Sequence, residues 1–474
     1  MYCFIHILFN PAPAAPTKWR ELFFIARAMC GPEPKRPAMH RVTLRRYSYC
    51  RAGGPCVHHL RHKISVKLRI ATLITVGLCG FGSMVSVADE PGMPKSLDEA
   101  IAMERADAMP LTAFYDTPAL TSSKPGDLLR QEPGNGYRLP NGASAVRILY
   151  HSLSADGADV ATSGVVLIPA GAAPAGGWPV IVWAHGTSGV ARQCAPSLEK
   201  DMEYGEEGLM PMVRAGFAVI ATDYHGLGTQ GPHEYLNKTA QGRDVIYSIP
   251  AAHAAVPSLA RRWIVIGHSQ GGLAAWSVAE MQATLHDPNY QGTISVAPAA
   301  DLRSLLIGMG KPGSSAAYYL GYMAYAMQVR TPSFNPSDML TGEALKRYTD
   351  VTTKGCWNYA YAAFINAPVA PVLKPGWDQL PAAVRFFEEG DLARAPAAPP
   401  LLVIAGEADE SVPFASLRAV AAKACRKGTA ITFRSYPGLD HDPTMDKSTP
   451  DQLAWARDRL AGKPTGSSCA SLAQ

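Results

Sequence analysis

Short apolar runs that alternate with helical segments restrict the fold of this chain more than any other feature. Runs with the length of buried parallel strands, each bounded by Gly, Pro or Asp, occur at 179–184, 217–222, 263–266, 293–297, 401–405 and 431–436. Two earlier runs, 145–152 and 160–168, are separated by Ala-Asp-Gly and predict a β-hairpin. Because strands alternate with helical segments such as 273–285, we expect an α/β fold with a mostly parallel central sheet flanked by helices.

The alternation stops between Asp301 and Pro399, where the sequence is rich in Ala, Tyr, Met and Pro. Long insertions into a compact domain usually cover a functional site. The sequence therefore predicts a helical cap at 301–399, inserted into a sheet domain formed by 89–300 and 400–474. The start of that domain, as far as about 142, is rich in Pro and Gly with one helical stretch at 96–106, and predicts an arm laid over the body.

The charge of the chain is unevenly distributed. The formal net charge is +5, but residues 1–88 hold 13 Lys and Arg against two Asp and Glu, so the remainder is acidic overall. The basic character belongs to the leader, and the body gives no reason to expect nucleic-acid binding.

The leader has the order of a secretory signal peptide. Lys63, Lys67 and Arg69 precede an apolar run at 70–87 that ends in small residues before Asp89. This order predicts a signal peptide at 63–88, cleaved near Ala88, and export to the periplasm or the medium. A retained signal anchor is the alternative, because about 18 apolar residues is the lower limit for a membrane span.

Signal peptides normally open a chain, yet here residues 1–62 come first, rich in Arg, Pro and Cys and without a period of 2 or 3.6. We interpret 1–62 as a non-structural upstream extension, with translation starting near Val66 or at another downstream codon.

Four of the nine cysteines follow the leader, namely Cys194, Cys356, Cys425 and Cys469. An even number of cysteines in a chain bound for an oxidising compartment predicts two disulfides. Of the three possible connectivities, we favour Cys194 with Cys356 and Cys425 with Cys469. Four buried thiols are the alternative.

Residues 267–271, Gly-His-Ser-Gln-Gly, fit the pattern G-x-S-x-G. The pattern alone is weak, but here it follows an apolar strand and precedes a helix. Ser269 would then lie on a tight strand-to-helix turn that exposes its hydroxyl, and the helix N-terminus favours negative charge beside it. The sequence therefore predicts a nucleophilic serine, with an ordinary glycine-rich turn as the alternative.

A serine hydroxyl needs a base to remove its proton and an acid to orient that base, and in this kind of fold the chain order is Ser, Asp or Glu, then His. Asp409 and His441 each follow a strand, so both should project from the sheet edge that carries Ser269. Alternative acids are Glu407 and Glu410, and the histidine is flanked by two further carboxylates at 440 and 442. The histidines at 185, 225 and 268 are predicted to orient backbone, and the aspartate at 223, which precedes the serine, is predicted to be structural.

The negative charge that develops on an attacked carbonyl needs two preorganised donors. The backbone N–H of Gln270 would supply the first, and that of Thr187, in the glycine-containing loop at 185–189, the second. The sequence contains no H-E-x-x-H motif, P-loop or G-x-G-x-x-G motif, so we expect no metal, nucleotide or flavin cofactor.

These motifs together resemble the secretory lipases of the α/β-hydrolase superfamily. The resemblance runs from about Phe114 to the C-terminus, and rests on the segments 267–272, 185–187, 194–197 (Cys-Ala-Pro-Ser), 223–228, 406–413 and 436–441. It implies an α/β-hydrolase fold with a cap, ester hydrolysis, and disulfides like those proposed above. The cap is the region least alike, and it should select the substrate.

The leading hypothesis is a lipase or carboxylesterase that acts on small-molecule or lipid esters through an acyl-enzyme, with transient contact to a lipid interface and no stable protein partner. A serine peptidase or amidase on the same fold is the second hypothesis. A catalytically silent binding protein is the third.

Overall fold

The structure is a computed structural model that describes residues 6–7, 26–27, 92–312, 314–365 and 371–473. The predicted signal peptide lies outside these residues, as does most of the predicted upstream extension. Residues 1–86 form one unit, in which β1 (His6–Ile7) pairs with β2 (Ala26–Arg27) in antiparallel orientation. Residues 87–474 form the second unit. Within the part of the chain that the structure describes, every helix is too short or too polar to span a lipid bilayer.

A nine-stranded sheet forms the centre of the second unit, in the order β11-β10-β9-β8-β6-β7-β5-β4-β3. The six strands from β11 to β7 pair in parallel, whereas β5, β4 and β3 are antiparallel to their neighbours. This mostly parallel sheet confirms the predicted fold class. The strands are β3 (Leu128–Pro133), β4 (Ser144–Leu153), β5 (Asp159–Ile168), β6 (Trp178–Ala184), β7 (Ala218–Thr222), β8 (Leu259–His268), β9 (Tyr290–Val296), β10 (Leu401–Gly406) and β11 (Ile431–Tyr436).

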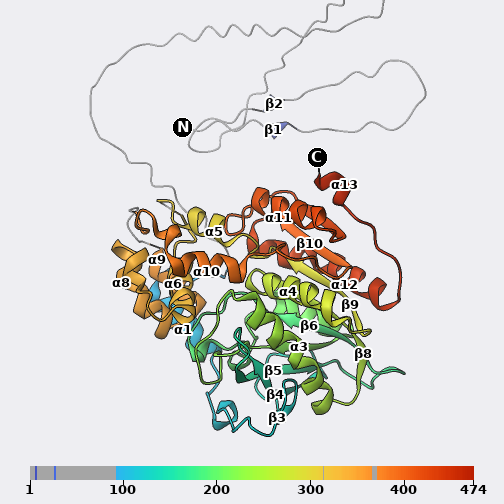
Figure 1. Ribbon diagram of the computed structural model, residues 1–474. Helices are drawn as coiled ribbons and strands as arrows, with labels where there is room; N and C mark the ends of the chain where they lie inside the picture. Colours follow the sequence, from blue (N-terminus) through green and yellow to red (C-terminus); the bar gives the residue numbers. More distant parts are fainter. Residues whose placement is uncertain (1–5, 8–25, 28–91, 313, 366–370, 474) are drawn as a thin grey trace, which may run out of the picture. The chain divides into compact units, whose positions relative to one another are not determined.

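Helices cover both faces of the sheet, because its strands bury side chains on both sides. In β8, Trp263 and Val265 pack with α3 (Lys238–Ala255) and α4 (Gln270–Leu285), which lie in front of the sheet in Figure 1. Ile264 and Ile266 belong to the opposite core, with α2 (Met210–Arg214) and α12 (His441–Leu460). This period of two in a continuously apolar run is what a parallel strand buried on both faces requires. Near β10 and β11, α11 (Phe414–Arg426) packs against α13 (Cys469–Leu472).

Helices without any strand fill the described part of 301–399, between β9 and β10. They gather beside one another on one side of the sheet (Figure 1), and we call them the inserted helices. They are α5 (Leu302–Met309), α6 (Tyr319–Arg330), α7 (Pro336–Met339), α8 (Gly342–Thr353), α9 (Trp357–Phe364), the 3-10 turn η5 (Trp377–Gln379) and α10 (Pro381–Gly390).

The segment before the hairpin is more regular than its Pro- and Gly-rich composition indicates. It contains α1 (Leu97–Asp107), the short turn η1 (Ala113–Tyr115) and the edge strand β3. Helix α1 packs against α9. Between β6 and α2 the chain forms the single turns η2 (Arg192–Cys194), η3 (Pro196–Leu198) and η4 (Gly205–Leu209).

Two disulfides join elements that are distant in sequence. Cys194 is bonded to Cys356, with 5.4 Å between their Cα atoms, and so links the loop after β6 to the start of α9. Cys425 is bonded to Cys469, with 5.5 Å between their Cα atoms, and links α11 to α13.

Candidate active site

Ser269 lies on a sharp turn between the end of β8 and the start of α4. Its backbone has φ 56° and ψ −117°, a conformation that costs energy for a residue with a side chain and that proteins retain mainly at functional sites. The turn is tight because its glycines allow close contact. A Cβ at Gly267 would lie 2.1 Å from the carbonyl oxygen of Gly271, and one at Gly271 would lie 1.8 Å from that of Ala184. The predicted strand-to-helix turn is therefore present.

We expect Gly271→Ala to destabilise the fold by more than about 3 kcal/mol, because the new methyl group would overlap the backbone of β6 and force the turn apart. Gly308→Ala is the matched control. Gly308 lies in α5, nothing surrounds its Cβ position within 4 Å, and alanine there should add about 0.5–1 kcal/mol of stability. Urea unfolding of both variants measures the difference, and equal stabilities would contradict the close contact at Gly271.

Ser269, His441 and Asp409 form a continuous hydrogen-bonded chain. The hydroxyl oxygen of Ser269 lies 2.8 Å from Nε2 of His441, and Nδ1 of His441 lies 2.8 Å from Oδ2 of Asp409. All three residues follow the carboxyl ends of parallel strands, so the sheet brings them together across 172 residues of sequence. Because a carboxylate accepts, Nδ1 of His441 carries a hydrogen, and in the neutral ring Nε2 is free to accept the serine proton.

The other carboxylates near His441 have different partners. Glu407 accepts a hydrogen bond from the hydroxyl of Ser435, and Glu410 lies 3.4 Å from that of Ser315. Asp440 caps α12 through the backbone N–H of His441. Only Asp409, among the described acids, reaches the imidazole of His441 with its carboxylate.

The electrostatic surroundings of His441 favour its protonated form. Burial alone would lower the pKa of His441, but the charge and hydrogen bond of Asp409, with Asp442 and Asp440 nearby, raise that pKa to about 9. The imidazole is thus held as a strong base by the carboxylates around it.

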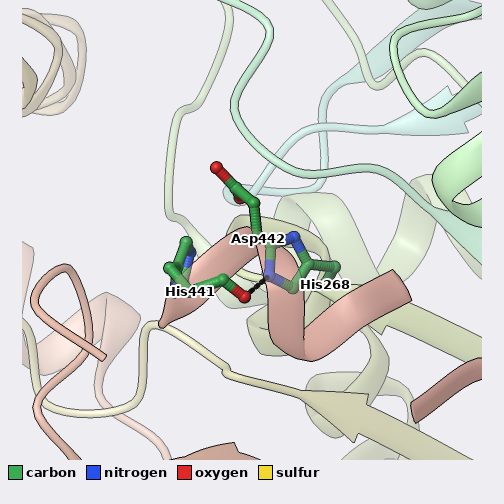
Figure 2. A group of neighbouring side chains, drawn as sticks. All are labelled: His268, His441 and Asp442. Carbon is green, nitrogen blue, oxygen red and sulfur yellow. Dashed lines mark hydrogen bonds between the residues drawn. The ribbon is translucent and has the colours of Figure 1, made fainter. Parts of the chain in front are cut away.

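His268 supports His441 from the other side. Nε2 of His268 donates to the carbonyl oxygen of His441 across 3.3 Å, as Figure 2 shows, and the hydroxyl of Tyr204 donates to Nδ1 of His268 across 2.8 Å. Burial lowers the pKa of His268 far below its ordinary value, so the ring is neutral and both of its nitrogens are satisfied. These hydrogen bonds agree with the prediction that His268 orients backbone.

Two groups of side chains bring possible metal ligands within 4.8 Å of one another. The first is His268, His441 and Asp442 (Figure 2), and the second is Asp107, Glu199 and Asp201. In the first group every ring nitrogen already has a hydrogen-bond partner. We therefore assign that group to the positioning of His441, and the second is an acidic cluster paired in part with Arg138.

The loop after β6 packs closely against Tyr204 at Gly186, where a Cβ would overlap the Tyr204 hydroxyl. The next residue, Thr187, and Gln270 both line the cavity at Ser269. Among the described residues, no group accepts a hydrogen bond from the backbone N–H of either. The structure therefore brings the two predicted donors beside the serine.

The remaining polar residues at this sheet edge form hydrogen bonds that hold neighbouring loop segments in place. His185 is buried, with Nδ1 near the carbonyl oxygen of Gly186 and Nε2 near that of Asp223, and burial lowers its pKa to about 4. Asp223 accepts hydrogen bonds from Ser163 and from the backbone and side chain of Ser197. Neither residue contacts His441, in agreement with the structural roles predicted for them.

A small cavity lies beside Ser269. Its volume is about 20 Å³, room for about one water molecule. The lining residues come from the sheet edge and from α5 and α6: Thr187, Tyr235, Leu236, Ser269, Gln270, Ala299, Leu305, Met309, Tyr319, Met323, Ser411 and Val412. A larger hollow of about 500 Å³, between the end of α3 and β8, contains none of the predicted site residues.

Sequence reasoning missed Tyr204, His233 and Tyr235, which surround the site. Each comes from a long connection between strands, and none belongs to a motif with a fixed spacing from Ser269. Their hydrogen bonds depend on how those connections fold, so the sequence carries no local signal for them.

The sheet, the strand-to-helix serine and the order of the three site residues define an α/β-hydrolase. The pattern of the secretory lipase family matches residues 200–468, more than half of the chain. The chain therefore belongs to the secretory lipase family, as its motifs predicted.

Individual relatives are distant. A Mycobacterium tuberculosis protein described as a probable inactive lipase is 24% identical over 379 residues, which cover 74% of this chain and 82% of that protein. Candida antarctica lipase A in its closed state has a TM-score of 0.61 at 16% identity, covering 76% of this chain and 88% of that one. A ligand-bound rice cell wall degrading esterase from Xanthomonas oryzae has a TM-score of 0.59 at 18% identity, covering 72% and 100%. At these identities the solved structures show the shared fold.

Proposed function

We propose that this protein is an exported serine hydrolase of carboxylic esters, a lipase or carboxylesterase. Ser269 is the nucleophile, His441 the general base and acid, and Asp409 the acid that orients the imidazole. The chain of two hydrogen bonds from Ser269 through His441 to Asp409, each 2.8 Å long, carries the proposal.

The geometry supports a two-step mechanism. Neutral His441 takes the proton of Ser269 as the hydroxyl oxygen attacks the ester carbonyl, and the backbone N–H groups of Gln270 and Thr187 donate to the oxygen that becomes negative. Protonated His441 then gives its proton to the leaving alcohol, which completes the acyl-enzyme. In the second step His441 activates a water molecule that releases the acid and restores Ser269.

In the same proposal, residues 89–300 and 400–474 form the catalytic domain and 301–399 its cap. Leu305, Met309, Tyr319 and Met323 of the inserted helices line the cavity at Ser269, which supports a cap that contacts the substrate. Membership of the secretory lipase family and the two disulfides support export, and we assign the export signal to 63–88.

A catalytically silent protein of the same fold is the other candidate, since the Mycobacterium tuberculosis relative is described as a probable inactive lipase. In this chain, however, the serine, histidine and aspartate are all present and hydrogen-bonded to one another. That geometry favours an enzyme.

The raised pKa of His441 predicts an alkaline pH dependence. The reaction needs the neutral imidazole, so kcat/KM should rise with pH up to about 9 and then level off. Asp442→Asn removes a negative charge that helps to raise this pKa, and it should move the limb of the profile to lower pH. Asp446→Asn is the control that should leave the profile in place, because Asp446 lies one turn further along α12, is only half-buried, and is paired with Lys447. A limb below pH 6.5 in the unmodified enzyme would contradict the electrostatics described above.

Initial rates on purified protein test the proposed function. p-Nitrophenyl esters with acyl chains of two to sixteen carbons are compared with aminoacyl p-nitroanilides. Ester turnover supports the proposal, and the chain-length profile distinguishes a lipase from a short-chain esterase. Anilide cleavage without ester cleavage would indicate a peptidase or amidase, and turnover of neither would indicate a binding protein.

A further inference from the structure

The side chain of Gln270 is held in one orientation by its contact with His233, which is itself hydrogen-bonded to His225. It is buried, with 1% of its surface exposed, and its Nε2 lies 3.2 Å from Nε2 of His233. Nδ1 of His233 lies 2.9 Å from the carbonyl oxygen of His225. A carbonyl oxygen only accepts, so Nδ1 of His233 carries the hydrogen.

The protonation of His233 then determines which way the amide points. Burial lowers the pKa of His233 to about 3, so the ring is neutral and its Nε2 can only accept. The donor to it must be the NH₂ group of Gln270. The amide oxygen of Gln270 therefore points away from His233.

That oxygen is a buried acceptor without a donor. Among the described residues, no group donates a hydrogen bond to Oε1 of Gln270, and Gln270 lines the cavity at Ser269. A buried acceptor left unpaired is unfavourable, because it has lost its hydrogen bonds to water and gained none in return. A substrate group that donates to it would remove this cost, whereas a plain hydrocarbon group would not.

The same cavity contains a donor. The hydroxyl oxygens of Thr187 and Tyr235, both lining residues, lie 2.8 Å apart. One of the two hydroxyl hydrogens forms the hydrogen bond between these oxygens, so the other hydrogen is free to donate. The rest of the lining is mostly apolar, and none of its residues is an Asp or Glu that would attract a cation.

We propose that the cavity selects esters of short hydroxy acids, whose hydroxyl group donates to Oε1 of Gln270 and accepts from the Thr187–Tyr235 pair. A hydroxyl is both donor and acceptor, and so satisfies both groups at once. The small cavity favours a short acyl group, although Met309 and Met323 in its wall are flexible side chains that can move aside. Gln270 is thus a specificity-determining residue through its side chain. This inference rests on the proposed ester hydrolysis.

The test compares methyl 3-hydroxybutyrate, as each enantiomer, with methyl butyrate by titration of the released acid. We expect the purified enzyme to prefer one hydroxy ester by at least about tenfold in kcat/KM. In Gln270→Met, which keeps the length of the side chain without the acceptor, the ratio should fall to about one. Gln241→Met is the matched control. Gln241 is equally buried and lacks partners for its amide, but does not line the cavity, so its loss should leave the ratio unchanged.

His233→Phe gives an independent measurement, because it leaves Gln270 in place but frees its amide to rotate, and it should also lower the ratio. A ratio below two in the unmodified enzyme would overturn the inference while leaving ester hydrolysis intact. The inference would also be overturned if the preference for the hydroxy ester stayed high in both Gln270→Met and His233→Phe. If Gln270→Met does not fold, an unchanged preference in His233→Phe alone would overturn it. Hydrolysis of neither methyl ester nor any p-nitrophenyl ester would instead remove the proposed function itself.

Discussion

Replacing Ser269 by alanine should lower ester kcat/KM by at least about 10⁴-fold, because among the described residues no other nucleophile is hydrogen-bonded to Nε2 of His441. The cavity and the backbone donors would remain, so a small residual rate above the uncatalysed one is expected. The measurement is hydrolysis of the best p-nitrophenyl ester, with thermal unfolding followed in parallel. The melting temperature should change little, since Ser269 makes its side-chain hydrogen bond only to His441 among the described residues.

Ser277→Ala is the matched control for this variant. Ser277 lies two turns further along α4, and its buried hydroxyl donates to the backbone carbonyl oxygen of Lys238 across 2.6 Å. Its removal should cost about 1 kcal/mol of stability and leave turnover in place. Full turnover in Ser269→Ala would refute the assignment of the nucleophile, and equal losses in both variants would show that the measurement reports folding.

The second large effect concerns the acid. Asp409→Asn should lower kcat/KM by about 10³- to 10⁴-fold, because an amide in place of the carboxylate no longer holds the hydrogen on Nδ1 of His441 or stabilises the imidazolium. The variant is nearly isosteric, and Oδ1 still can accept from the backbone N–H of Val412, as it does in the unmodified protein. We therefore expect a folded enzyme with a defective base.

Glu407→Gln and Glu410→Gln test the same prediction, because these two glutamates are the alternative candidates for the acid. Both residues lie in the loop that carries Asp409, but their carboxylates contact Ser435 and Ser315 instead of His441. Their rates should stay within about threefold of the unmodified enzyme, as for surface carboxylates with modest local effects. A larger loss in Glu407→Gln or Glu410→Gln than in Asp409→Asn would transfer the acid role to that glutamate.

The sequence predicted eight of the nine strands of the sheet, and the placement of Ser269, Asp409 and His441 at one sheet edge, because these signals are local. The buried strands are short apolar runs, and Ser269, Asp409 and His441 each follow such a run directly. Once the strands are parallel, residues at their carboxyl ends must share an edge. The chain order of the three residues then narrows the choice of acid without any knowledge of contacts.

The parts that the sequence did not reveal depend on contacts between distant segments. Strand β3 carries no alternating pattern, and its existence depends on pairing with β4. Tyr204 matters because it meets His268, 64 residues away, and His233 because it meets Gln270, 37 residues away. No spacing rule connects these pairs, so only the folded chain shows how the histidine base is supported and how the Gln270 amide is oriented.

The disulfide between Cys194 and Cys356 fixes one side of the site covalently and leaves the other side without such a link. It ties the start of α9 to the loop that carries Thr187, and the backbone N–H of Trp357 donates to the carbonyl oxygen of Ser188 in the same place. By contrast, α5 and α6, which line the cavity, have no covalent link of this kind to the sheet edge. When a substrate enters, the start of α9 and the loop that carries Thr187 should therefore keep their positions relative to each other, so that the backbone N–H of Thr187 stays directed at the substrate carbonyl.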